Sequence, residues 1–248
     1  MEGSHSMLLS SRLGTGTAPT VKGCRVESRA KAQQQLREIR VCTNRACRRQ
    51  GSFETLETMS CIAPPNATVK SCGCLGRCGG GPNLVVLPDG LIVSHCGTAA
   101  RAAEVMGTLF AGAYDPKTCL DALALRKRAD LEFAKRNFSE AELLLSQAID
   151  SKPFGGIHVI FKCRSIVRLE LGNYSAALQD AREALALAPG YSEACICEGD
   201  ALLALNKFDL AEQSYLASLD IDSSIRHSKW FKARITKLQE KLADANAP

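Results

Sequence analysis

Three segments in the second half of the chain repeat one pattern: FSEAELLLSQAIDSKP (138–153), YSAALQDAREALALAP (174–189) and FDLAEQSYLASLDIDS (208–223). Their aligned alanines lie 36 and 34 residues apart, at Ala141, Ala177 and Ala211. Twelve residues before each alanine stands another small residue: Ala129, Ser165 and Gly199. A near-constant period with small residues at fixed places predicts helix pairs that cross closely and stack into a solenoid.

The same segments carry further signals of paired helices. An aromatic residue precedes each aligned alanine by three, and Pro153 and Pro189 end two of the repeats. Asp115 followed by Pro116 predicts the start of the first helix. Residues 116–222 therefore resemble three tetratricopeptide repeats, and the resemblance implies a concave surface that binds a protein. A generic helical bundle is the alternative. Residues 223–244 are predicted to form a capping helix, with Trp230, Ile235 and Leu238 covering the last repeat.

Length and composition bound the remaining possibilities. The chain has 248 residues, of which 46% are hydrophobic and 23% charged, which excludes wholesale disorder and leaves room for two domains. No apolar run approaches the roughly 20 residues of a membrane-spanning helix. The net charge of +5 is mild and its excess lies in the first half of the chain, which is weak for nucleic-acid binding because that function usually needs a dense basic surface. No nucleotide-binding motif or Ser/His/Asp set is visible, so a stand-alone enzyme is not predicted.

Residues 1–33 differ in composition from the rest of the chain. They are rich in Ser, Thr, Gly and Arg and poor in acidic residues. This composition favours an organelle transit peptide, of plastid rather than mitochondrial type, over a cytosolic tail. We therefore expect a chloroplast location, in the stroma or at the thylakoid.

The twelve cysteines are unevenly distributed. Seven of them lie between positions 42 and 96. No secretory signal is visible and no C-x-x-C pair occurs, so the cluster indicates metal or redox chemistry in a reducing compartment. The cysteines of the helical half are predicted to be small core residues, namely Cys119, Cys163, Cys195 and Cys197.

The region that holds the clustered cysteines has mixed local patterns. Its strands are predicted at 38–42, 68–72, 83–87 and 91–94, and its helices at 52–62, with Ser52 as N-cap, and 98–110. Pro88-Asp89-Gly90 predicts a hairpin turn between the last two strands. The order β-α-β-β-α is typical of a two-layer α/β domain of thioredoxin-like type.

Four cysteines in this region have the spacing of a cluster site: Cys42-x4-Cys47 and, 26 residues on, Cys74-x3-Cys78. Thiolates are the ligands of iron–sulfur clusters, and glycines between them let backbone N–H groups approach sulfur. Residues 36–112 closely resemble the thioredoxin-like 2Fe–2S ferredoxins, which include the small ferredoxin subunit of the proton-pumping NADH dehydrogenases. Leu75, Gly76 and Pro82 match the loop of that family. The resemblance implies that Cys42, Cys47, Cys74 and Cys78 bind a 2Fe–2S cluster for one-electron transfer.

Several alternatives stay open at this site. A structural zinc ion could use the same four thiolates. Cys72 could replace one ligand, whereas Cys61 is predicted to be a packing residue. Four arginines are predicted either to lie near the cluster and raise its potential or to form a solvated surface: Arg45, Arg48, Arg49 and Arg77.

The two halves together predict a redox protein that docks on a protein partner, without nucleic acid, in plastid electron transport. The alternative is an assembly factor or scaffold for a thylakoid complex, with a structural or sensory cluster or zinc. The repeats also resemble carboxylate-clamp modules that bind chaperone tails. The clamp positions are occupied by Arg126, Asp130, Cys163 and Ile196, and an acid facing a carboxylate partner disfavours this function.

Overall fold

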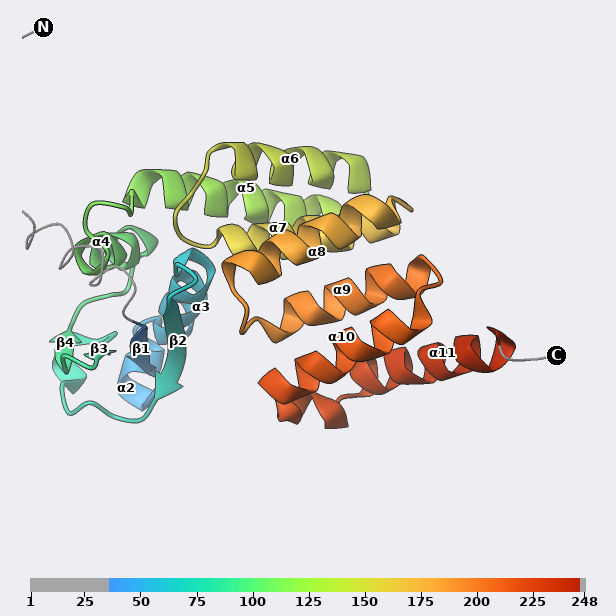
Figure 1. Cartoon of the computed structure of the whole chain (residues 1–248). Helices are drawn as coiled ribbons and strands as arrows, with labels where there is room; N and C mark the ends of the chain where they lie inside the picture. Colours follow the sequence, from blue (N-terminus) through green and yellow to red (C-terminus); the bar gives the residue numbers. More distant parts are fainter. Residues whose placement is uncertain (1–35, 246–248) are drawn as a thin grey trace, which may run out of the picture. The chain divides into compact units, whose positions relative to one another are not determined.

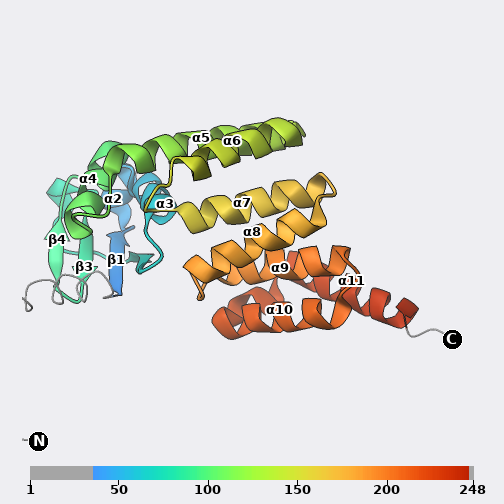
Figure 2. The same ribbon diagram turned by 45° about the horizontal axis from the view of Figure 1, so that its top comes forward.

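The computed structural model describes residues 36–245, in which a small sheet domain precedes a series of long helices (Figures 1 and 2). The candidate transit peptide lies outside the described residues. In this part of the chain no helix is long and apolar enough to cross a membrane.

The sheet domain contains one four-stranded sheet with the order β2-β1-β3-β4. The strands are β1 (Arg37–Cys42), β2 (Ala67–Cys72), β3 (Leu84–Leu87) and β4 (Leu91–Val93). Strands β1 and β2 are parallel, with Cys42 in register with Cys72, whereas β3 runs antiparallel to β1 and to β4. The carboxyl ends of β1 and β2 therefore meet at one edge, and each strand ends there in a cysteine.

Two helices pack against this sheet, and the predicted element order is confirmed. Helix α3 (Ser52–Ile62) and helix α4 (Ala99–Leu109) enclose the core between them and the sheet, with Ile39, Met59 and Met106 fully buried. The N-cap of α3 is Gly51, at φ +86°, and not Ser52, which is already helical. A left-handed residue joins α3 to an unpredicted short helix, α2 (Arg45–Arg49), so the cap position moves one residue back.

The helical half is a solenoid of three antiparallel helix pairs, as predicted. The bounds are α5 (Pro116–Ala134) with α6 (Phe138–Asp150), α7 (Ile157–Glu170) with α8 (Tyr174–Leu187), and α9 (Ser192–Ala204) with α10 (Phe208–Ile221). Figure 2 shows the pairs following one another along the stack. Asp115 caps α5 by accepting hydrogen bonds from the N–H groups of Lys117 and Thr118.

The small residues lie where the helices cross. Ala141, Ala177 and Ala211 are fully buried. Ser165 is buried too, and its hydroxyl donates to the Ala177 carbonyl at 2.8 Å. A Cβ atom on Gly199 would lie 2.5 Å from the ring of Tyr215. The small residues of the repeat pattern are therefore required by the close crossing of the paired helices.

The end of the solenoid differs from the prediction. Residues Ser223–His227 form a 3-10 turn, and helix α11 begins only at Lys229 and ends at Ala245. Phe231 covers the last repeat, since it is buried and its ring stands edge-on to Tyr215 at 6.0 Å. Trp230, expected in that role, is 47% exposed. Successive helical residues point about 100° apart, so only one of the two neighbours can face the repeat. Leu238 is buried as expected.

The two halves are joined by a packed junction. Tyr114 belongs to the core of the sheet domain, and its hydroxyl donates to the Ile62 carbonyl at 3.2 Å. The loop between α6 and α7 also reaches the end of α3, where the Gly156 N–H donates to the Ala63 carbonyl at 2.9 Å. A Cβ atom on Gly155 would lie 1.9 Å from the Ile62 oxygen. Glycine at this position permits the loop to contact the α3 backbone.

Candidate functional site

The cysteines predicted as ligands come together in two pairs at the carboxyl ends of β1 and β2. The Sγ atoms of Cys74 and Cys78 are 3.7 Å apart. The Cys42 and Cys47 thiols are close enough that each influences the pKa of the other. Cys42 and Cys47 are buried, whereas Cys74 and Cys78 are exposed. One pair therefore lies inside the domain and the other at its surface.

Local backbone geometry positions each pair. Gly76 has φ +78°, and this left-handed turn brings its N–H to 3.4 Å from Cys74 Sγ. Asn83 fixes the other side: its amide nitrogen donates to the Arg77 carbonyl at 2.6 Å and to Cys47 Sγ at 3.5 Å. The amide of Asn83 was not identified in the sequence, because a single Asn before a strand carries no signal.

The surroundings of the buried pair act on its thiols in opposite directions. Burial raises the pKa of Cys42, but hydrogen bonds from the Asn44 and Leu75 backbone and the Cys47 thiol outweigh it, so the pKa is lowered. Burial dominates at Cys47 and raises its pKa. At the exposed pair, hydrogen bonding and repulsion from Cys74 raise the pKa of Cys78. One thiol of the buried pair is thus predisposed to ionise, as a metal ligand must.

The four thiols are the type of ligand that a metal–thiolate centre uses. Two sulfurs held by one tetrahedral metal at about 2.3 Å lie about 3.8 Å apart, which is close to the Cys74–Cys78 separation. No group of three or more His, Cys, Asp or Glu side chains among residues 36–245 is arranged around a single metal position. The thiols instead form pairs, and a 2Fe–2S cluster takes four thiolates, two on each iron.

The other residues named at this site have distinct positions. Cys72 is partly buried and in register with Cys42, so it stays a possible replacement ligand. Cys61 is partly buried against the core, and its sulfur accepts a hydrogen bond from Arg126 of α5 at 3.0 Å. Arg45, Arg48, Arg49 and Arg77 are all exposed.

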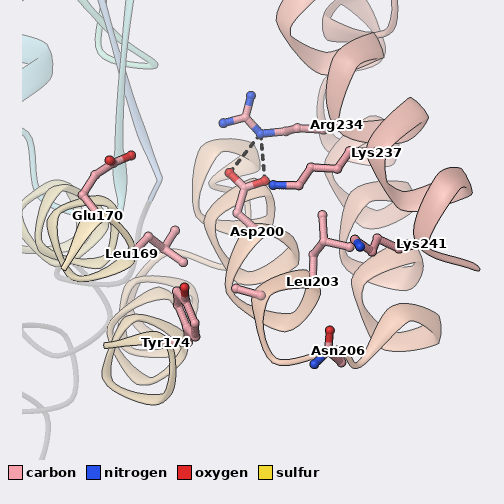
Figure 3. Close-up of a pocket in the computed structure, with 10 residues that line it drawn as sticks. Leu169, Glu170, Tyr174, Asp200, Leu203, Asn206, Arg234, Lys237 and Lys241 are labelled. Atoms are coloured by element: carbon pink, nitrogen blue, oxygen red, sulfur yellow. Dashed lines mark hydrogen bonds and ion pairs between the residues drawn. The ribbon is translucent and has the colours of Figure 1, made fainter. Parts of the chain in front are cut away.

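A second candidate site is the concave groove of the solenoid, lined by α7, α9 and α11. Its outer part is a hollow of about 570 Å³, drawn in Figure 3. Leu169, Tyr174 and Leu203 form its apolar wall, and Lys237 and Lys241 extend into it from α11. The inner part continues through the residues Lys162, Ile166, Glu193, Cys197 and Trp230.

Ion pairs organise the groove. Arg234 binds both carboxylate oxygens of Asp200, at 2.8 and 2.9 Å, and Asp200 also accepts from the Tyr215 hydroxyl at 2.7 Å (Figure 3). Lys162 pairs with Glu193 at 3.0 Å. Burial, aided by Lys162, lowers the pKa of His158 to about 4, so this histidine is neutral at pH 7. The basic residues that line the groove belong neither to the repeat pattern nor to the clamp positions: Lys162, Arg234, Lys237 and Lys241.

Of the residues at the clamp positions, Arg126, Asp130 and Cys163 lie near one another, and Ile196 lines the inner part of the groove. Arg126 donates to the Cys61 thiol. Ile196 is buried in the core of the last repeats, and Asp130 is exposed. The polar groups that line the groove therefore differ from those of a carboxylate clamp.

Comparison with known proteins finds relatives of the helical part. No protein-family profile matches the chain. The chain is 32% identical over 101 residues to the Protein STIP1 homolog of Dictyostelium discoideum and 29% identical over 104 residues to Heat shock protein STI1 of Saccharomyces cerevisiae. These matches cover 41% and 42% of this chain. They span only 18% of each relative's length.

Solved structures of similar fold are also helical repeats. The Sgt2 TPR domain from Aspergillus fumigatus has a TM-score of 0.47 and 21% identity, covering 54% of this chain and 84% of that chain. The first TPR domain of Spaghetti, bound to the HSP90 peptide SRMEEVD, has a TM-score of 0.46 and 23% identity. It covers 53% of this chain and 98% of that chain.

Proposed function

We propose that the sheet domain binds a 2Fe–2S cluster through Cys42, Cys47, Cys74 and Cys78, and that the protein transfers single electrons while docked on a protein partner. The observation that carries this proposal is the pairing of the four thiols at one edge of the sheet. The thioredoxin-like ferredoxin assignment of the domain is part of the same proposal. It is supported by the sheet order and by the β-α-β-β-α sequence of elements.

A bound cluster would supply a one-electron redox centre, and the chain's residues have separate tasks around it. Donor groups to sulfur spread the negative charge of thiolates and raise the reduction potential. The Gly76 N–H and the Asn83 amide are such donors, on Cys74 and Cys47 respectively. Burial of Cys42 and Cys47 keeps water from the inner pair, and exposure of Cys74 and Cys78 gives an electron a short path to a partner.

The concave groove is proposed as the docking site for the partner. It combines an apolar wall with fixed ion pairs and with lysines from α11, as binding surfaces commonly do. Because the α6–α7 loop and α5 contact α3 directly, the groove and the thiol edge belong to one packed unit. A partner bound in the groove would therefore keep a defined orientation toward the sheet domain.

The redox part of the proposal is tested by reduction of the full chain purified without oxygen. We expect dithionite to bleach the visible absorption, to give an electron paramagnetic resonance signal of one unpaired electron per two irons, and to be reversed by mild oxidation. A coloured protein that cannot be reduced and reoxidised would support the alternative, a scaffold or assembly factor with a structural cluster. A colourless protein with one zinc would contradict the cluster.

The docking part is tested with a defined peptide. One curated relative is named Heat shock protein STI1, and the first TPR domain of Spaghetti was solved bound to SRMEEVD. Because Arg126 is bound to Cys61 here, we expect no saturation of this chain by SRMEEVD up to about 1 mM, whereas a clamp would bind far below that. Tight binding would contradict this expectation and would indicate that the groove binds chaperone tails.

The composition of residues 1–33 supports action in a plastid. Attaching those residues to a fluorescent protein in plant cells tests this: we expect fluorescence inside plastids. Diffuse cytosolic fluorescence would contradict the location and leave the redox proposal intact.

A further inference from the structure

The surface beside the thiol edge carries a concentration of unpaired positive charge. Residues 42–53 and 71–83 contain four arginines and no acidic residue. All four side chains are exposed: Arg45, Arg48, Arg49 and Arg77. Four of the five carboxylates in residues 36–112 pair with other cations, through Arg37, Arg40, Lys70, Arg101 and Lys127. The fifth, Glu54, follows Phe53 and forms no salt bridge among the described residues. Positive charge on this surface therefore exceeds the negative charge beside it.

Two of the arginines line a hollow next to the end of β2, which we name the arginine hollow. It is formed by Thr43, Asn44, Arg45, Arg48, Ser71, Cys72 and Gly73. Asn44 caps helix α2 by accepting from the Arg45 N–H at 2.6 Å, which fixes the direction of this helix and of the arginines on it. The hollow thus presents guanidinium groups from a constrained backbone.

An aromatic side chain extends this surface. The guanidinium of Arg48 lies 4.9 Å from the centre of the Phe53 ring, and Phe53 is 49% exposed. Arginine and aromatic residues are enriched at the centres of protein interfaces. Arg48 covers one face of the Phe53 ring. The combination favours a protein partner, and a nucleic acid is the alternative that the experiment below separates.

The four arginines are not among the groups that dominate the pKa values of the buried thiols. The groups that dominate the pKa of Cys42 and Cys47 are burial, backbone N–H groups, Asn83 and each other's thiol. The arginine that lowers the pKa of Cys72 against the effect of burial is Arg40, from β1. The four arginines therefore fit contact with a partner protein better than control of the potential of the sulfur site.

We infer that the arginine hollow, together with Phe53 and Arg77, is a docking surface for an acidic protein surface, separate from the concave groove. Opposite charge across such an interface speeds association and fixes orientation, and both effects weaken as salt screens the charges. The inference does not require a bound cluster, because it depends on the arginines and Phe53 alone. With a cluster present, the acidic partner would be held at the exposed thiol pair.

The test uses the full chain and two charged probes, a 20-residue poly-L-glutamate peptide and a 20-nucleotide single-stranded DNA. We expect the peptide to bind in low salt and to weaken steeply as salt is added. The double variant Arg45→Glu/Arg48→Glu should weaken peptide binding about tenfold, and Arg45→Gln/Arg48→Gln by a smaller factor. The matched control Lys207→Glu/Lys229→Glu has the same change in net charge on exposed lysines of the solenoid and should change binding less than about twofold.

Three results would overturn the inference. The first is DNA binding more tightly than the peptide and depending on the same arginines, which would indicate a nucleic-acid surface. The second is an equal loss in the control variant, which would indicate a general effect of net charge. The third is no peptide binding in low salt. Circular dichroism of each variant establishes folding, and iron content reports separately on the proposed cluster, so the two proposals can fail independently.

Discussion

The exposed cysteine pair of the sheet domain and the cysteines of helix α9 have the same chemistry and opposite surroundings. Cys74 and Cys78 face each other 3.7 Å apart at the surface, with a backbone N–H directed at Cys74. In the solenoid, Cys195 and Cys197 are buried in a helix, and burial raises the pKa of both thiols. At the sheet edge, hydrogen bonds outweigh burial at Cys42 and lower its pKa, which suits a metal ligand, whereas nothing outweighs burial at Cys195 and Cys197.

Local backbone geometry separates cysteines that can share a metal site from cysteines that fill a hydrophobic core. Glycine-rich loops let the first set of thiols converge, whereas helical geometry directs neighbouring cysteines in a helix to different sides. We expect changes in the first region to alter bound metal with little effect on stability. Changes in the second region should alter stability with little effect on bound metal.

The largest expected effect is on bound iron. Cys78→Ser removes a proposed ligand of the exposed pair, and we expect nearly complete loss of iron and of visible absorption. Cys61→Ser and Cys195→Ser should retain both. Iron and sulfide analysis of the three variants measures this, and Cys72→Ser shows whether Cys72 is the actual ligand. A Cys78→Ser protein that keeps its full iron content would contradict the ligand assignment.

A buried ion network should dominate the stability of the solenoid. Asp180 is 2% exposed and binds Arg164 at 2.8 Å and Arg168 at 2.9 Å. Asp180→Ala removes the buried carboxylate that the two guanidinium groups share, and leaves Arg168 with Glu142 as its remaining ion pair and Arg164 with the Ser146 hydroxyl. We therefore expect a loss of about 3 kcal/mol in the free energy of unfolding. Urea denaturation measures it, with Asp209→Ala at an exposed position as the control. A loss below about 1 kcal/mol would mean that solvent reaches the network.

The junction between the regions gives the next effect. Gly155→Ala places a methyl group against the Ile62 carbonyl, and displacement of the loop should cost about 3 kcal/mol. Gly190→Ala is the matched control, since no atom lies within 4 Å of a Cβ there and its backbone is not left-handed. Equal losses in both variants, by thermal denaturation, would show that the junction is loosely packed.

The smallest effect is a pH dependence in the solenoid. The pKa of His158 falls to about 4 in the folded protein, against 6.5 for the free side chain. The unfolded chain therefore binds a proton first, so stability present above pH 6.5 is lost as pH falls toward 4. Allowing for partial exposure, we expect wild type to lose about 2 kcal/mol more than His158→Gln between pH 7 and 4.5. Parallel losses would contradict the burial of this imidazole.

Most of the fold could be predicted from short-range patterns. The three repeats follow from small residues at fixed spacing, and the strands follow from apolar runs between glycine and proline. Helix α2 could not be predicted, because its five residues are mostly basic and carry no apolar periodicity. The choice of Phe231 over Trp230 depended on the rotation of α11, which tertiary packing against Tyr215 sets.

Less of the candidate sites could be predicted. The cysteine spacing identified the thiols that pair, but the donors to sulfur include a side chain from Asn83, which carries no local signal. The contact of Arg126 with Cys61 joins residues 65 positions apart, so no local pattern contains it. The groove lysines come from α7 and α11, and only stacking of the repeats brings them together.

The most direct test of the central claim is metal and sulfide analysis, with a visible spectrum, on the full chain purified without oxygen. The account predicts two irons and two acid-labile sulfides per chain, with broad absorption in the visible region. A colourless protein that contains one zinc and no sulfide would contradict it, and the four thiols would then be a structural metal site beside a binding solenoid.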